Sequence, residues 1–155
     1  MSAKEIAVYQ AWLQDFYNHS TYPQKMQYVE TGTSFYGQEP LCDQKLLKDG
    51  VNPSYLRALR DLGTASYLIP PFDMGFARTF DPYVLTVNGK SPEKPFIRHI
   101  FSRVVFSRDG KQAFLNATYI KGPGFGQGGT SDDLLASQDG QVWHFRTVGC
   151  VGIID

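Results

Sequence analysis

Two Asp-Gly pairs, Asp109-Gly110 and Asp139-Gly140, constrain the fold of this chain more than any other feature. Each pair stands between short runs rich in apolar and aromatic residues, which is the pattern of a β-hairpin with a tight turn. A glycine-rich segment, KGPGFGQGGT, separates the two hairpins. The stretch from Phe101 to Val148 is therefore predicted to form a four-stranded antiparallel meander.

The first turn fixes which side chains share a face, because successive strand residues point to opposite sides of a sheet. With Asp109-Gly110 as a two-residue turn, Arg108 is expected opposite Lys111. The same count predicts one apolar and one mixed face. The expected apolar pairs are Phe106–Ala113, Val104–Leu115 and Ser102–Ala117, and the expected mixed pairs are Val105–Phe114, Arg103–Asn116 and Phe101–Thr118.

The second turn is expected to continue both faces. Its count predicts Ala136–Trp143 and Leu134–Phe145 on the core face, with Leu135–His144 and Asp133–Arg146 on the reverse face. If the sheet carries a function, we expect it on the mixed face, where Arg103, Asn116 and His144 would lie.

Three helices are expected before the sheet. Ser2 and Glu5 have capping-box spacing at the start of an apolar stripe that runs to about Asn18. A second helix is expected over Glu39 to Lys48, and a third follows the N-cap Asn52 and ends before Gly63. One interpretation of the ambiguous segment 21–37 places a further short helix around Tyr22 to Val29.

Residues 64–82 combine prolines with large apolar side chains, among them Phe72 and Phe76, and show no regular period. We interpret this segment as a flap that covers the sheet, with an exposed recognition loop as the alternative. A strand is expected from Tyr83 to Val87, ending at Asn88-Gly89.

These elements predict one α+β domain over residues 1–155. Residues 1–63 would be mainly helical, 64–82 an irregular covering segment, and 83–148 an antiparallel sheet. The N-terminal helices are expected on one face of a curved sheet. A nuclear-transport-factor-2-like or a cystatin-like architecture would satisfy this pattern, and neither implies a function.

The composition restricts the partners. Lys plus Arg and Asp plus Glu number 15 each, so no electrostatic argument supports nucleic-acid binding. No apolar run is long enough for a membrane span, and no signal peptide is evident. We expect a soluble protein, either cytoplasmic as written or in the periplasm or envelope if a signal peptide was removed.

The two cysteines, Cys42 and Cys150, lie far apart in sequence. They could form one disulfide in an oxidising compartment or remain two buried thiols in a reducing one. Neither has a Cys or His neighbour at metal-ligand spacing, so neither a metal site nor a cofactor is expected.

Strong catalytic motifs are absent from the sequence. Gly124, Gly126 and Gly129 have Gly-x-Gly-x-x-Gly spacing, but a strand rather than a helix is expected after them, which argues against a phosphate-binding loop. The loop could instead contact a partner through Phe125 and Gln127. The candidates for acid–base chemistry are His99 and His144, the latter with Asp133 as its carboxylate.

About a third of the chain carries a resemblance. Its residues are Ser102, Arg103, Val104, Phe106, Ala113, Gly124, Gly126, Leu134, Gly140 and Trp143. This stretch resembles the C-terminal half of small bacterial envelope proteins and lipoproteins, most of which have no assigned function. The resemblance implies an envelope location and transfers no catalytic residue. The chain departs from the pattern at its end, VGCVGIID, where aromatic-rich strand ends are usual.

The leading function hypothesis is a non-catalytic binding or inhibitory protein of the immunity type, which occludes a protein partner. The residues expected to bind are Arg103, Asn116, Arg146, Phe125, Gln127, Phe72 and Phe76. The alternative is a small enzyme or ligand-binding protein with a pocket on the sheet that contains His144 and Arg103. The sequence leaves the oligomeric state open.

Overall fold

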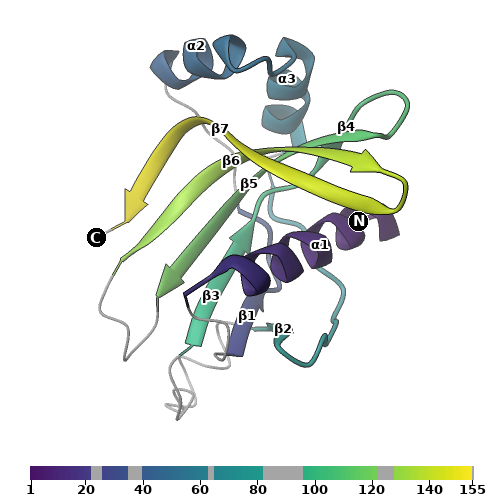
Figure 1. Cartoon of the computed structure of the whole chain (residues 1–155), viewed down its shortest axis with the longest axis vertical. Coiled ribbons are helices and arrows are strands. Elements are labelled where there is room, and N and C mark those ends of the chain that lie inside the picture. Colours follow the sequence, from purple (N-terminus) through teal and green to yellow (C-terminus); the bar gives the residue numbers. More distant parts are fainter. Residues whose placement is uncertain (22–25, 35–39, 63–64, 82–95, 122–127, 155) are drawn as a thin grey trace.

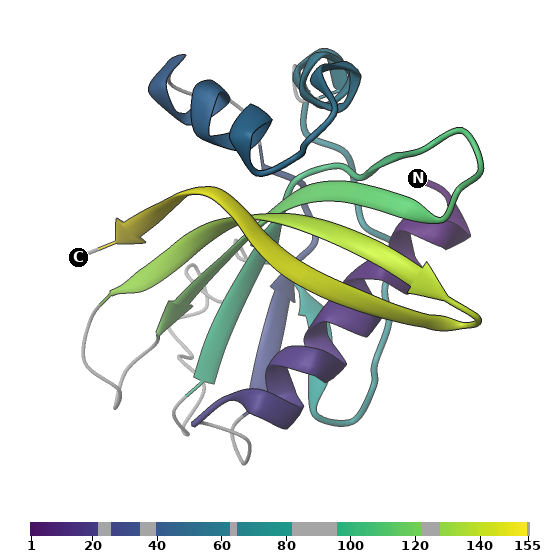
Figure 2. The same cartoon turned by 45° about the horizontal axis from the view of Figure 1, so that its top comes forward.

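One twisted, mostly antiparallel sheet lies between helices on both of its faces (Figures 1 and 2). The computed structural model describes residues 1–21, 26–34, 40–62, 65–81, 96–121 and 128–154. The α+β fold class is confirmed. The elements are α1 (Ala3–His19), β1 (Met26–Glu30), α2 (Pro40–Lys48), α3 (Pro53–Leu62), β2 (Ala77–Phe80), β3 (Phe96–Phe101), β4 (Val105–Phe106), β5 (Gln112–Lys121), β6 (Gly129–Asp139) and β7 (Val142–Ile154).

Helix α1 begins at the predicted capping box. The Glu5 amide donates to Ser2 Oγ over 3.2 Å, and the Ser2 amide donates to Glu5 Oε2 over 2.9 Å. These reciprocal bonds satisfy backbone donors that an uncapped helix leaves open. The helix buries Val8, Tyr9 and Leu13 against the sheet, so the predicted apolar stripe is confirmed.

The strand order is β2-β1-β3-β5-β6-β7, with β4 also paired to β5. Strand β1 runs parallel to both β2 and β3, and the remaining pairs are antiparallel. The helix expected around Tyr22 to Val29 is wrong, because residues 26–30 are strand β1. Both neighbours of β1 come from distant parts of the chain, so no local turn signal marks it. The strand expected over residues 83–87 lies outside the described residues.

The first hairpin has the predicted register only near its turn. Val105 pairs with Phe114 and Phe106 with Ala113, but Phe101 pairs with Ala117 rather than Thr118. Residues 102–104 therefore stand opposite only residues 115–116, so this side of the ladder holds one extra residue, as in a β-bulge. The pairs expected for Phe101 and Ser102 are therefore wrong, the ladder has no pair at residues 103 and 104, and Phe101 faces the core.

The second hairpin turns one residue later than predicted. Gly140 and Gln141 form the turn, and Gly140 has a φ of 62° at the first central position, as a type II′ turn requires. All pairs shift by two residues and keep their faces. The pairs expected for Ala136, Leu134, Leu135 and Asp133 are wrong; the structure has Ala136–Phe145, Leu134–Thr147, Leu135–Arg146 and Asp133–Val148.

The sheet has a hydrophobic core on each side. Helix α1 covers one face, and the first core lies between this helix and residues of β1, β2, β3, β5, β6 and β7. Helices α2 and α3 cover part of the other face, which corrects the expectation that all helices share one side. The second core consists of Leu46, Val51, Leu56, Leu59, Val105, Phe114, Leu135 and Val148. Three of its members on the sheet, Val105, Phe114 and Leu135, are apolar residues of the predicted mixed face, and the helices remove them from water.

The described part of the covering segment, residues 65–81, packs on the α1 side. Ile69 is buried in that core, and Phe72 and Phe76 pack against it. This agrees with the flap interpretation. The segment is more regular than expected, because it contains strand β2.

Candidate binding edge at strand β7

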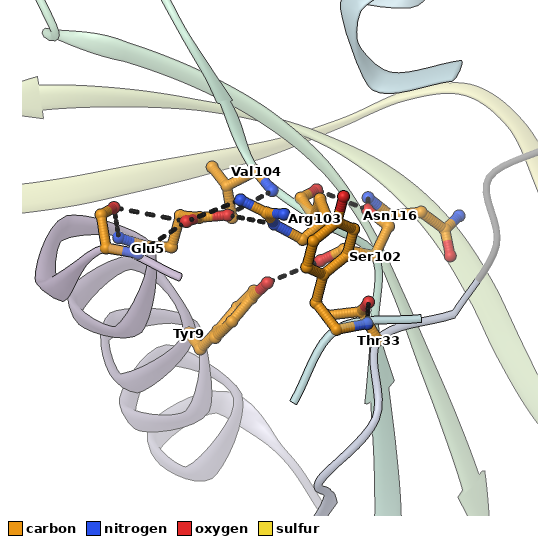
Figure 3. Close-up of polar contacts among 9 residues, drawn as sticks. Glu5, Tyr9, Thr33, Ser102, Arg103, Val104 and Asn116 are labelled. Atoms are coloured by element: carbon orange, nitrogen blue, oxygen red, sulfur yellow. Dashed lines mark hydrogen bonds and ion pairs between the residues drawn. The ribbon is translucent and has the colours of Figure 1, made fainter. Parts of the chain in front are cut away.

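Arg103 forms a bidentate ion pair inside the molecule (Figure 3). Its Nε lies 2.7 Å from Glu5 Oε1, and its Nη2 lies 3.2 Å from Glu5 Oε2. The Tyr67 ring stacks 4.2 Å from the guanidinium carbon. Burial acts to raise the pKa of Glu5, but hydrogen bonds from Arg103, Ser2 and Val104 outweigh it, so that pKa lies below its ordinary value. The hydrogen bond and the charge of Glu5 in turn raise the pKa of Arg103 above its ordinary value.

The residues around this ion pair join α1 to the bulged segment of the sheet (Figure 3). Tyr9 donates its hydroxyl to the Ser102 carbonyl over 2.7 Å. Ser102 Oγ donates to the Arg103 carbonyl and accepts from the backbone amide of Asn116, each over 2.8 Å. Because Glu5 neutralises the charge of Arg103, this arginine links α1 to the sheet and is not free to bind an anion.

Asn116 and Asp133 meet on the opposite face. Asn116 Nδ2 donates to Asp133 Oδ1 over 3.0 Å, and the hydroxyls of Thr118 and Ser131 contact Asn116 Oδ1. Asp133 is buried. These side-chain hydrogen bonds join β5 to β6 in addition to the backbone pairing of the two strands.

His144 does not join that network. It pairs with Ser137, four positions along β6 from Asp133, and its side chain is exposed. The register that would have placed Asp133 beside His144 and opposite Arg146 is wrong. Arg146 is also exposed and donates to the Asp49 carbonyl over 3.1 Å. The residues expected to converge on one pocket therefore lie apart.

His99 is fully buried between α1 and the sheet. Its Nε2 lies 2.7 Å from Gln27 Oε1, and the Phe16 ring meets it edge-on at 4.9 Å. Burial lowers the pKa of His99 to about 3, so the imidazole is neutral at physiological pH. Among the described residues, neither His99 Nδ1 nor Gln27 Nε2 has a hydrogen-bond partner. His99 thus has no access to a substrate in solution.

Two surface hollows add no pocket of the expected kind. One of about 510 Å³ lies between α3 and β4 and includes Tyr55 and Leu62 in its walls. Another of about 820 Å³ lies at the first hairpin turn beside Arg108. Neither contains Arg103, Asn116 or His144. Phe125 and Gln127 lie outside the described residues.

The two edges of the sheet differ in how they are covered. At the β2 edge, the chain folds back on itself: the Thr79 amide donates to the Phe72 carbonyl over 3.1 Å, and the Met74 amide donates to the Ala77 carbonyl over 2.8 Å. These bonds occupy the outer side of β2. Strand β7 forms the other edge and is the outermost strand in Figure 1.

Helix α2 covers β7 around a β-bulge that begins opposite Asp132 and Asp133. The Gly149 amide donates to Asp49 Oδ2, just after α2, over 2.8 Å, and the Cys150 amide donates to Cys42 Sγ over 2.9 Å. Gly149 has a φ of 70°, and a Cβ there would lie 2.6 Å from Leu46 Cδ2. A glycine is therefore required for this contact.

Beyond the bulge the edge of β7 is open. Val151 and Ile153 point to the α1 side of the sheet and are 56% and 78% exposed. Among the described residues, no hydrogen bond is made to the outer backbone of residues 151–153. Val142, at the other end of the strand, is similarly exposed at 58%.

The sequence interpretation missed this edge because it ended the last strand at Val148. In the structure Gly149 forms the bulge and the strand continues to Ile154. A usable signal was present in the β-branched residues Val151, Ile153 and Ile154.

Comparison of the chain with protein-family models, curated proteins and solved structures gives no match. The resemblance of the meander to envelope proteins stays a prediction. Within the described ranges, no three His, Cys, Asp or Glu side chains gather to hold a metal ion. None of the described helices is long and apolar enough to cross a membrane.

Proposed function

We propose that this chain is a non-catalytic protein-binding module that receives an extended segment of a partner along the end of β7. The observation that carries this proposal is the open edge at residues 151–153, where Val151 and Ile153 stand exposed. An unpaired strand edge offers backbone donors and acceptors to an incoming strand, and side chains on its face add apolar contact.

The state of the ionisable residues supports a binding role over a catalytic one. Arg103 is paired with Glu5, and His99 is buried and neutral. His144 is exposed and separate from Asp133. A ligand pocket built on Arg103 and His144 has no comparable support, because the two lie in different surroundings.

An inhibitory role would follow from the same geometry. A partner segment added to β7 would be held extended and removed from its own contacts. The immunity-type hypothesis therefore takes a specific form, in which the chain occludes a partner by capturing one of its strands.

The test uses two valines of one strand as a matched pair. Val151→Lys places a charge in the open run, and Val142→Lys makes the same change at the other end of β7, with nearly equal exposure. Losing the burial of one valine and inserting a charge should weaken partner binding by on the order of 10- to 100-fold.

The tagged wild-type chain and both variants would be used for affinity capture from the native host, with quantitative mass spectrometry. Binding of the recovered partner would then be measured with purified proteins. We expect wild type and Val142→Lys to bind alike and Val151→Lys to lose the partner. Equal binding by all three, or no partner recovered by wild type, would contradict the proposal.

A further inference from the structure

The fold brings the two cysteines of the chain together. Cys42 is in α2 and nearly buried, whereas Cys150 follows Gly149 in the bulge of β7 and is exposed. The Cys150 amide lies 2.9 Å from Cys42 Sγ. The side chain of Cys150 therefore starts from the residue whose backbone already touches the other sulfur.

The position of the Cys150 backbone is the geometric basis for a disulfide. Because its amide lies within hydrogen-bond distance of Cys42 Sγ, the two cysteine side chains start close together, which is the proximity that a disulfide requires. Burial is the main cause that raises the pKa of Cys42 to about 11, and the neighbouring Cys150 and Asp133 raise it further.

We propose that Cys42 and Cys150 form an intramolecular disulfide when the chain meets a low-molecular-weight disulfide such as oxidised glutathione. The exposed Cys150 thiolate attacks one sulfur of the oxidant, which forms a mixed disulfide and releases one thiolate. The Cys42 thiolate then attacks the Cys150 sulfur and releases the second. The protein dithiol loses two electrons, the oxidant gains them, and the two thiol protons end on the two released molecules.

The bond would change how α2 is attached to the sheet. In the dithiol form, α2 holds β7 through the contacts of Asp49 and Leu46 with Gly149. The disulfide would add a covalent link at the next residue and close a long loop of chain. Its formation is independent of the docking proposed for residues 151–153, so either idea can fail alone.

The experiment exposes the full native chain to oxidised glutathione near neutral pH, traps remaining thiols by alkylation, and identifies the products by mass spectrometry. The wild-type chain is expected to yield a cross-linked peptide pair containing Cys42 and Cys150. Cys42→Ser should stop at a glutathione adduct on Cys150. Cys150→Ser should stay unmodified while folded, because Cys42 is buried.

A second measurement does not depend on peptide mapping. Closing a loop of roughly 100 residues should raise the Tm of the oxidised wild type by on the order of 10 °C over its reduced form. Neither serine variant should show this rise. A wild-type chain that keeps a glutathione adduct on Cys150, or that cross-links only between molecules, would overturn the proposal.

Discussion

The buried His99 makes the stability of this protein depend on pH in a way that can be calculated. Its pKa is lowered by burial from 6.5 to about 3 in the folded chain, so between these values the unfolded chain binds one more proton. The stability contribution is complete above pH 6.5 and is lost as pH falls toward 3. For one histidine the stability lost is about 2 kcal/mol at pH 5 and below 1 kcal/mol at pH 6.

The perturbation that isolates this contribution is His99→Gln, which keeps a polar side chain beside Gln27 and removes the titration. The free energy of unfolding would be measured by urea titration of wild type and variant at pH 7.5, 6 and 5. Other groups titrate in both proteins and cancel in the difference. We expect wild type to lose about 2 kcal/mol relative to His99→Gln between pH 7.5 and 5.

His144→Gln removes an exposed histidine from the same sheet and is measured alongside as the control. His99→Phe repeats the test if the glutamine variant does not fold. A difference between wild type and the His99 variant that stays constant from pH 7.5 to 5 would refute the conclusion that this histidine is buried and neutral.

Three further predictions concern the same fold. Glu5→Gln keeps the capping box but leaves Arg103 without its charge partner, so it should lower the free energy of unfolding, measured in urea, by about 3 kcal/mol. Adding Arg103→Met should recover part of that loss. A loss below about 0.5 kcal/mol for Glu5→Gln would contradict the buried ion pair. Gly129→Ala should lower the Tm more than Gly140→Ala, because a Cβ at Gly129 would overlap the Tyr119 carbonyl oxygen, whereas at Gly140 the space is open and only the positive φ of the turn opposes a side chain; equal losses would refute this. Leu134→Ala should cost about 2–5 kcal/mol and Leu68→Ala, at a position 79% exposed, within about 0.5 kcal/mol, so similar values would count against the assigned core.

The sequence predicted the features that depend on neighbouring residues. The capping box of Ser2 and Glu5 and the helix after Asn52 act within a few residues, so their signals are local. The register near the first turn was also predictable, because the turn sets it directly. These local elements were enough to establish the α+β class.

The features that the sequence did not predict depend on contacts between distant segments. The extra residue lies in segment 102–104, where Arg103 and Ser102 contact Glu5 and Tyr9 of α1. Counting residues outward from the hairpin turn cannot reveal contacts with a distant helix. The parallel pairing of β1 with β2 and β3 joins remote parts of the chain. The candidate binding edge could not be predicted either, because strand order decides which strand is outermost.

The cover that α2 gives β7 at the bulge has a consequence for self-association. Strand β7 is 13 residues long, and an unbroken apolar edge of that length is a template for intermolecular sheet growth. The bulge at Gly149 bends the strand, and α2 interrupts its edge, which leaves only a short run beyond it. A bulge and a covering helix are both features by which proteins keep an edge strand from pairing with another chain.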